Sequence, residues 1–169
     1  MDSIRASYNF HLTFRIVIRS IGIQLNVLPP NVQYMPIMEW TPELGVNVKK
    51  LDDQHKKLIA LINKLHDAMR AGQGKQVLEG TLQELAAYTV YHFETEENTQ
   101  QFKMYPGCLE HKAEHAAFVK KVTDFQDEYV ENRLSLTQDL MDFLRDWVNN
   151  HIKKTDKKYS TVFNEKGLA

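Results

Sequence analysis

Apolar residues from Leu51 onward recur at alternating steps of three and four, the spacing that places them on one face of an α-helix. Four stretches show this pattern, and we predict helices over about residues 53–71, 75–103, 109–130 and from 135 onward. The inward stripe of the first predicted helix consists of Leu51, His55, Leu58, Ile62, Leu65 and Met69. Because only a few residues connect successive stretches, the pattern predicts an all-α fold, an up-down-up-down four-helix bundle.

Polar and small residues mark the expected helix ends. Asp52 is placed to cap the N-terminus of the first helix, and Gly72 is placed to end it. Pro106-Gly107 separates the second helix from the third. Ser135 supplies the hydroxyl of a capping box, so we expect the fourth helix to open there.

Residues 1–37 do not continue the helical pattern. Their apolar stretch at 16–27 has neither helical nor alternating spacing, and Pro29-Pro30 near its end interrupts regular structure. We therefore expect residues 1–37 to be a poorly ordered extension outside the core. Residues 38–169 are expected to form the domain.

Composition excludes several classes of protein. A chain of 169 residues with 43% hydrophobic and 25% charged residues is ordinary for one globular domain. The formal net charge of −1 predicts no nucleic-acid partner, and no apolar run approaches the roughly 20 residues that would span a membrane. The single cysteine, Cys108, excludes a disulfide within the chain and fits the reducing cytoplasm, where we expect the protein to be located.

Histidine is the informative residue type, because each predicted inward stripe carries at least one. The five histidines on these stripes are His55, His92, His111, His115 and His151. A buried polar group without a partner costs about 1–3 kcal/mol, so five unrelated histidines in one core would be a large liability. Glu96 lies one helical turn after His92, and a buried carboxylate needs a cation. A metal centre explains all of these residues together.

Asp156 is a seventh candidate ligand, in a less simple position. It follows His151 by five residues, which corresponds to about 140° around an ideal α-helix. Its carboxylate reaches the same centre only if the helix contains a π-type turn there, or if the metal lies to one side. By itself, Asp156 would be a solvent-exposed charge in a lysine-rich segment.

These motifs resemble those of the hemerythrin family, in particular the single-domain bacterial hemerythrins, over about residues 38–159. The resemblance rests on Trp40, Asp53-Gln54-His55-Lys56, His92-Phe93-x-x-Glu96-Glu97, His111-x-x-x-His115 and Trp147-x-x-x-His151-x-x-x-x-Asp156. The positions that match the family's metal ligands are His55, His92, Glu96, His111, His115, His151 and Asp156. The resemblance implies a cofactor of two iron ions with a bridging oxo or hydroxo group, and dioxygen as the partner, bound reversibly.

A count of ligands predicts one open position at such a site. Two six-coordinate irons offer about twelve positions, and imidazole and carboxylate both suit iron. The five histidines, two bridging carboxylates and one bridging oxygen would fill all but one. His111 and His115, one turn apart, should share an iron with His151, as the resemblance also implies, so the vacancy belongs to the iron held by His55 and His92.

A dry pocket is expected beside the vacancy, because water that reaches bound oxygen would promote its loss and leave oxidised iron. The expected wall consists of Leu58, Phe93, Trp147, Val148 and Ile152. Any one of them could equally be an ordinary core residue. Gln100 stands one turn after Glu96, where relatives commonly carry methionine, and its amide either faces the site or points outward.

The expected function is oxygen storage, or oxygen delivery to oxygen-requiring enzymes, by a monomer that is not itself an enzyme. The alternative is oxygen or redox sensing, or a di-iron oxidase activity at the same site. Ferritin-like oxidases use Glu-x-x-His pairs, and no histidine here follows a glutamate by three residues. His111-x-x-Glu114-His115 also matches a zinc-protease pattern, but that function leaves the other candidate ligands unexplained. We therefore expect Glu114, like His66, to be a surface residue.

Overall fold

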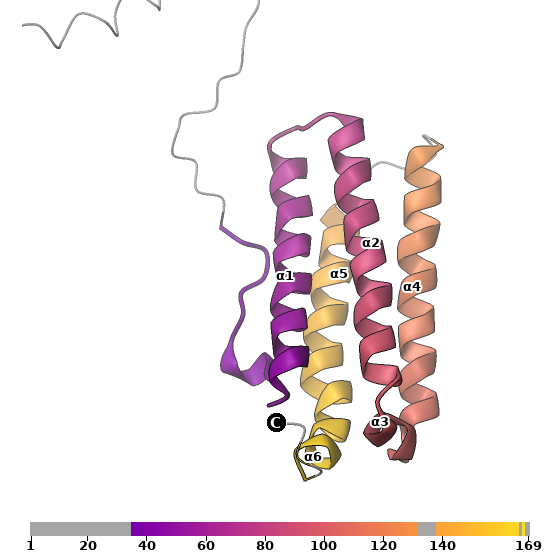
Figure 1. Cartoon of the computed structure of the whole chain (residues 1–169). Helices are drawn as coiled ribbons and strands as arrows, with labels where there is room; N and C mark the ends of the chain where they lie inside the picture. Colours follow the sequence, from indigo (N-terminus) through magenta and orange to yellow (C-terminus); the bar gives the residue numbers. More distant parts are fainter. Residues whose placement is uncertain (1–34, 132–137, 166, 168–169) are drawn as a thin grey trace, which may run out of the picture. The chain divides into compact units, whose positions relative to one another are not determined.

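Four long helices lie side by side in the computed structural model, which describes residues 35–131, 138–165 and 167 (Figure 1). They are α1 (Lys49–Arg70), α2 (Lys75–Glu97), α4 (Cys108–Val130) and α5 (Gln138–Asn150). The helix α1 packs against α2 and α5, and α2 packs against α4. The described residues contain no strand, and the expected all-α, up-down-up-down bundle is confirmed.

The first helix begins earlier than expected, and it ends just before Gly72, as predicted. Its N-cap is Val48, which offers no capping side chain, so the assignment of Asp52 as the N-cap is wrong. Asp52 lies in the first turn instead, where its carboxylate accepts a hydrogen bond of 2.7 Å from the backbone N–H of Val46. At the other end Gly72 has a φ of 62°, a left-handed conformation that glycine adopts without strain.

The second helix is shorter than the predicted range of 75–103, because the helix is interrupted around Thr99. The Thr99 hydroxyl donates to the carbonyl oxygen of Glu96 at 2.9 Å and accepts from the backbone N–H of Phe102 at 3.1 Å. These local bonds replace helical ones and open a separate short helix, α3 (Gln100–Met104). Gln100 therefore begins α3 and does not extend α2. Its side chain lies outside the described residues, as does Ser135, the expected start of the fourth helix.

A π-helical segment, η3 (His151–Asp156), follows α5 directly and leads into α6 (Lys157–Glu165). Its wider turn brings residues five apart onto the same side, as the spacing of His151 and Asp156 requires if both reach one centre. Of the two possibilities that the sequence left open for Asp156, the π-type turn is the one observed.

The core has two parts. The larger part fills the bundle between the long helices and includes Leu58, Ile62, Leu85 and Leu144. The smaller part lies where α3 and α6 meet and consists of Val46, Val48, Leu51, Phe102, Tyr159 and Phe163. The two short helices therefore close the end of the bundle that carries the histidines. No helix in the described ranges is both long enough and apolar enough to cross a membrane.

The predicted boundary between extension and domain stays a prediction, since residues 1–34 lie outside the described part of the chain. Among the residues that follow, Met38 is buried in the bundle core and Ile37 packs partly against it. The backbone N–H of Met38 donates to the side-chain oxygen of Asn63 at 3.1 Å, and the Asn63 amide donates back to the Met38 carbonyl at 2.8 Å. These two bonds attach the segment before η2 (Pro42–Leu44) to α1.

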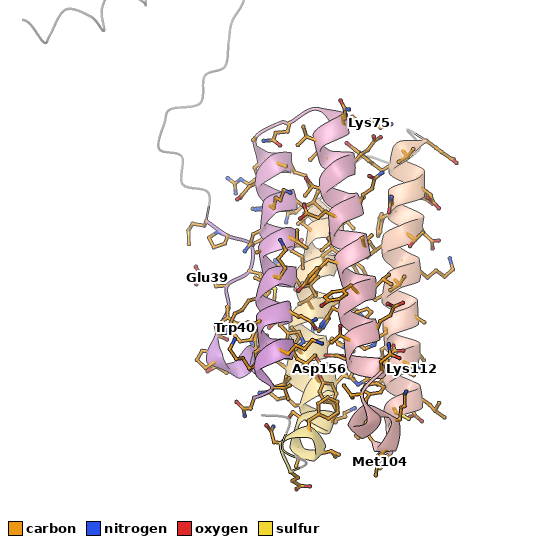
Figure 2. The ribbon with its side chains drawn as sticks, viewed as in Figure 1. Glu39, Trp40, Lys75, Met104, Lys112 and Asp156 are labelled. Atoms are coloured by element: carbon orange, nitrogen blue, oxygen red, sulfur yellow. The ribbon has the colours of Figure 1, made fainter. Side chains whose placement is uncertain are left out.

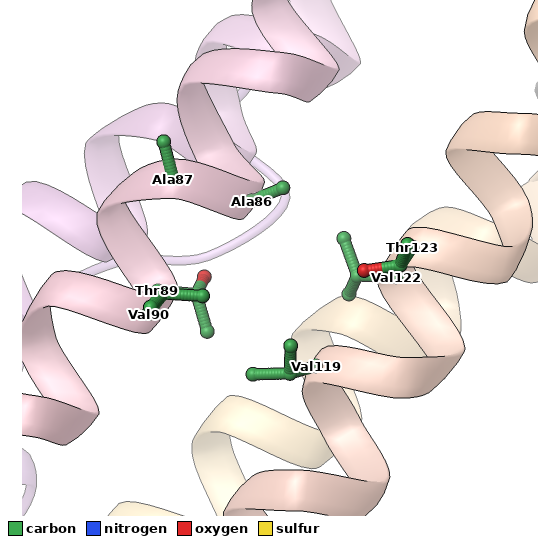
Figure 3. A pocket seen from close by; sticks show the side chains of 7 residues that line it. All are labelled: Ala86, Ala87, Thr89, Val90, Val119, Val122 and Thr123. Carbon is green, nitrogen blue, oxygen red and sulfur yellow. The ribbon is translucent and has the colours of Figure 1, made fainter.

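A small cavity of about 150 Å³ lies between α2 and α4 (Figure 3). It is lined by Ala86, Ala87, Thr89, Val90, Val119, Val122 and Thr123. A wider groove of about 590 Å³ shares Val90 and Val119 with it and reaches Phe93 and His115. The groove between α2 and α4 therefore reaches one of the candidate ligands, His115.

Candidate metal centre

All seven candidate ligands lie together in the interior of the bundle, where Asp156 is visible between the helices (Figure 2). They form two groups, one of His111, His115, His151 and Asp156, and one of His55, His92 and Glu96. Within each group the candidate donor atoms lie within 4.8 Å of one another. None of the seven is more than 5% exposed. Helices α1, α2 and α4 and the segment η3 each contribute at least one of them.

Three imidazole nitrogens of the first group form a nearly equilateral triangle. The Nε2 atoms of His111, His115 and His151 lie 3.0, 3.0 and 2.9 Å apart. A metal about 2.1 Å from each nitrogen, with angles of 90° between them, would separate the nitrogens by about 3.0 Å. A tetrahedral ion would separate them by roughly 3.4 Å. The triangle therefore fits one face of an octahedron, a geometry open to iron, better than it fits a tetrahedral zinc site.

The two carboxylates each face both groups of histidines. Glu96 places Oε1 at 3.6 Å from Nε2 of both His55 and His92, while its Oε2 lies 3.5 Å from Nε2 of His115. Asp156 places Oδ2 at 3.4 Å from Nε2 of His55, while its Oδ1 lies 3.2 Å from Nε2 of His111. Each carboxylate is thus positioned to bridge two cations, one in each group.

Several of these polar atoms have no hydrogen-bond partner among the described residues. Those that face the centre are Nε2 of His55, Oε2 of Glu96 and both carboxylate oxygens of Asp156. Buried polar atoms are almost always paired, and an uncompensated buried carboxylate is costly. A set of unpaired nitrogen and oxygen atoms that converge in this way is what bound cations would satisfy, so the residues fit a di-iron centre.

The outer nitrogens of two of the histidines contact carboxylates around the site. Nδ1 of His115 lies 2.9 Å from Oε1 of Glu97, and Nδ1 of His151 lies 2.9 Å from Oε2 of Glu114. A carboxylate can only accept here, so each Nδ1 carries the proton and each Nε2 directs a lone pair inward. Converging lone pairs repel one another unless a cation lies between them.

One of the two surface assignments is wrong, and the other holds. His66 is only 6% exposed, so its placement at the surface is wrong; it lies on α1 outside both groups of candidate ligands. Glu114 is exposed as expected, but its carboxylate is bound to His151 and accepts a second hydrogen bond from the Thr155 hydroxyl at 3.0 Å. This contact joins α4 to the π-helical segment, so spacing within one helix gave no signal for it.

Tyr159 also contacts the site, and sequence reasoning missed it. Its hydroxyl donates to Oε1 of Glu96 at 2.5 Å, and its ring lies 5.4 Å from that of His111. Burial is the main cause of the strongly raised pKa of Tyr159, and the neighbouring carboxylates Asp156 and Glu96 add to it. The phenol therefore remains a hydrogen-bond donor that orients Glu96. Its position three residues after Asp156, on the same side of the helix, is the signal that could have revealed it.

Of the five residues predicted to form the oxygen pocket, three belong to the bundle core and two stack on histidines of the site. Leu58, Val148 and Ile152 are buried in the bundle core. Phe93 stacks on His115 with ring centroids 3.7 Å apart, and Trp147 stacks on His151 at 4.2 Å. The two aromatic rings thus cover histidines of the first group. That the five residues surround bound oxygen stays a prediction.

Burial and the two carboxylates give the histidines different affinities for protons. Burial lowers the pKa of His92 to about 4, and it also lowers that of His115. Burial acts in the same direction on His55, but the negative carboxylates of Asp156 and Glu96, 3.4 and 3.6 Å from its Nε2, outweigh it and raise the pKa of His55 to about 9. In the metal-free protein His55 is therefore protonated at neutral pH.

We expect metal uptake by the metal-free protein at pH 7.5 to release at least one proton, because a ligating imidazole must be neutral. Before uptake, the raised pKa of His55 contributes stability that is fully present below pH 6.5 and is lost as the pH rises through about 9. An indicator dye in weakly buffered, anaerobic solution would measure the release. The variant His55→Asn should release less, and metal uptake by the unaltered protein without proton release would contradict the prediction.

Comparison with known proteins places these groups in a family context. The family model "Hemerythrin HHE cation binding domain" matches residues 46–162. A bacteriohemerythrin of Methylococcus capsulatus is 40% identical over 126 residues, which cover 74% of this chain and 95% of that protein. A hemerythrin-like protein of Naegleria gruberi is 32% identical over 126 residues, covering 73% and 91%.

Solved structures agree with this match. The crystal structure of a wild-type hemerythrin superposes with a TM-score of 0.69 at 40% identity and covers 75% of this chain and 97% of that one. The crystal structure of a hemerythrin mutant superposes with a TM-score of 0.71, also at 40% identity, covering 76% and 98%. The matched region contains all seven candidate ligands, and the two groups support a di-iron, oxygen-binding role of the hemerythrin type. This chain belongs to the hemerythrin family.

Proposed function

We propose that the protein binds dioxygen reversibly at a non-haem di-iron centre. His111, His115 and His151 would hold one iron, His55 and His92 would hold the other, and Glu96 and Asp156 would bridge the two. Two ferrous ions held there would together supply the two electrons that reversible dioxygen binding uses. The observation that carries the proposal is the position of the two buried carboxylates, each with one oxygen toward either group of histidines.

The two groups contain different numbers of protein donors, and this difference suggests which iron binds oxygen. The first group offers three imidazoles and the second only two, while each carboxylate directs one oxygen to each group. The second group is therefore one donor short of the first. We place the oxygen-binding position on the side of His55 and His92 for this reason.

The surrounding side chains would keep water away from bound oxygen. Leu58, Val148 and Ile152 are at most 2% exposed, and Phe93 and Trp147 cover two of the histidine rings. An apolar, enclosed environment of this kind suppresses proton leakage to a reactive group. Such protection supports a carrier, which must release oxygen unchanged, over an oxidase.

Within this function we propose oxygen storage or delivery by a cytoplasmic monomer, without an enzymatic role. The free thiol of Cys108 accords with a reducing compartment. Five neutral imidazoles and two carboxylates carry less negative charge than a carboxylate-rich set, so they favour high-valent iron less. Sensing and oxidase activity are the alternatives that the test of oxygen binding must separate.

The decisive measurement combines iron content with visible spectra. Protein reconstituted anaerobically with ferrous iron should hold two irons per chain, gain a new absorption on exposure to oxygen, and lose it again when oxygen is removed. His111→Ala should cost at least one iron, since it removes one corner of the nitrogen triangle. His66→Ala is the matched control, because His66 is buried but outside both groups, and it should retain both irons.

Each contrary result has a defined meaning. A single iron in the unaltered protein would refute the di-iron proposal. Two irons with a spectrum that changes irreversibly in oxygen, with turnover of a reductant, would replace reversible binding by an oxidase activity.

A further inference from the structure

The side chains that contact the outer nitrogens of the histidines differ between the two groups. In the first group the carboxylate of Glu97 binds His115 and that of Glu114 binds His151. In the second group the contact is neutral: Nδ1 of His92 lies 3.1 Å from the amide oxygen of Gln54. One histidine in each group, His55 in the second and His111 in the first, has no hydrogen-bond partner for Nδ1 among the described residues.

Each of these contacts is itself held in place. Glu97 also forms an ion pair with Lys112 at 3.1 Å, and its side chain is 20% exposed. Glu114 accepts from Thr155 as well as from His151. The amide nitrogen of Gln54, whose side chain is buried, donates to the Thr95 hydroxyl at 3.3 Å, which fixes the amide oxygen toward His92. The difference between the groups is therefore built into the fold.

A carboxylate bound to the outer N–H of a ligating histidine raises the basicity of the inner nitrogen and fixes its orientation. A neutral amide fixes the orientation with much less effect on basicity, because it carries no charge. The more basic nitrogens stabilise ferric iron relative to ferrous iron. In this chain that effect falls on one side of the centre only.

We infer that Glu97 and Glu114 are positioning residues that make the iron site of His111, His115 and His151 the more easily oxidised of the two. The inference rests on the proposed function, since it needs a di-iron centre. It assigns to Glu97 and Glu114 a role in setting the reduction potential, and it assigns to Gln54 the role of keeping the oxygen-binding side less electron-rich. The net effect is a centre whose two halves differ in potential before oxygen arrives.

The test replaces each carboxylate by its neutral isostere. Glu97→Gln and Glu114→Gln keep an oxygen that can accept from the imidazole but remove the charge, so the measured change reports the charge. The potential for the first one-electron oxidation of the di-ferrous protein is measured by mediated titration of the visible spectrum. Each substitution should reduce the preference for ferric iron about tenfold, which corresponds to a rise of about 59 mV.

Matched variants separate this effect from a general loss of negative charge. Glu94→Gln on α2 and Glu110→Gln on α4 remove one carboxylate each from exposed positions and should leave the potential unchanged. The reciprocal variant Gln54→Glu places a carboxylate on His92 and should lower the potential. If one of the variants Glu97→Gln and Glu114→Gln fails to fold or to hold iron, the other variant and Gln54→Glu still test the inference.

Retention of ferric iron against a competing chelator provides a second measurement, and the two substitutions should weaken it about tenfold or more. Potentials for Glu97→Gln and Glu114→Gln equal to those of the two controls would overturn the inference, and the carboxylates would then only anchor the rings. That result would leave the proposed function intact, provided the unaltered protein holds two irons and binds oxygen. Unaltered protein that holds no iron would refute both.

Discussion

Removal of iron by a chelator is expected to lower the free energy of unfolding by about 4 kcal/mol, where free iron had been at about a thousand times its dissociation constant. The reason is that metal binds the folded chain, in which seven ligands converge, and not the unfolded one. Without metal the folded chain also retains buried, unpaired atoms, among them both carboxylate oxygens of Asp156. Denaturant unfolding followed by circular dichroism, under anaerobic conditions with and without a ferrous chelator, would measure the loss.

A variant with an incomplete iron site is the control for this experiment. His111→Ala, which removes one corner of the nitrogen triangle, should be less stable than the unaltered protein in the presence of iron and should change less when the chelator is added. If the chelator destabilised both proteins equally, it would be acting on the fold by another route. An unchanged midpoint in the unaltered protein would show that iron does not stabilise the native state.

Leu58→Ala should lower the free energy of unfolding by about 2–5 kcal/mol and should also hasten autoxidation of the oxygenated protein. Leu58 is 1% exposed and lies on α1 one turn after His55, so truncation leaves a cavity next to the second group of ligands. Water that enters the cavity would reach the oxygen-binding side and promote the loss of oxygen with oxidised iron left behind. Decay of the oxygenated spectrum with time would measure the rate.

Leu65→Ala is the matched control for Leu58→Ala. Leu65 lies on the same helix, two turns further from His55, and is fully buried. It should lose a similar amount of stability but retain the autoxidation rate of the unaltered protein. Equal autoxidation rates in the two variants would remove Leu58 from the predicted pocket. If neither variant lost stability, the burial of Leu58 and Leu65, on which both arguments depend, would be contradicted.

The helices could be predicted from the sequence because their apolar spacing is local and strong, but their ends depended on competing hydrogen bonds. The predicted second helix ran to residue 103, and the hydroxyl of Thr99 ended it earlier by bonding to the backbone on both sides. Asp52 was expected to cap the first helix, but it binds the incoming chain at Val46 instead. Side chains that can bond in more than one way were where pattern reasoning failed.

The candidate ligands could also be identified from the sequence, because pairs such as His92 with Glu96 and His111 with His115 are one helical turn apart and so share a face in any packing. The spacing of His151 and Asp156 allowed two geometries, and only the structure showed the π-type turn that joins them. His66 was assigned to the surface from its spacing on one helix, whereas packing against the rest of the bundle buries it.

The sequence by itself therefore determined the bundle and its inward histidines, since both follow from periodicity along single helices. Only the tertiary structure decided what surrounds those histidines: Glu97 on His115, Glu114 on His151, Gln54 on His92 and Tyr159 on Glu96. The physical reason is that these contacts join different helices or reach across the end of the bundle. They depend on how far each helix is rotated and shifted against its neighbours, which spacing within one helix does not specify.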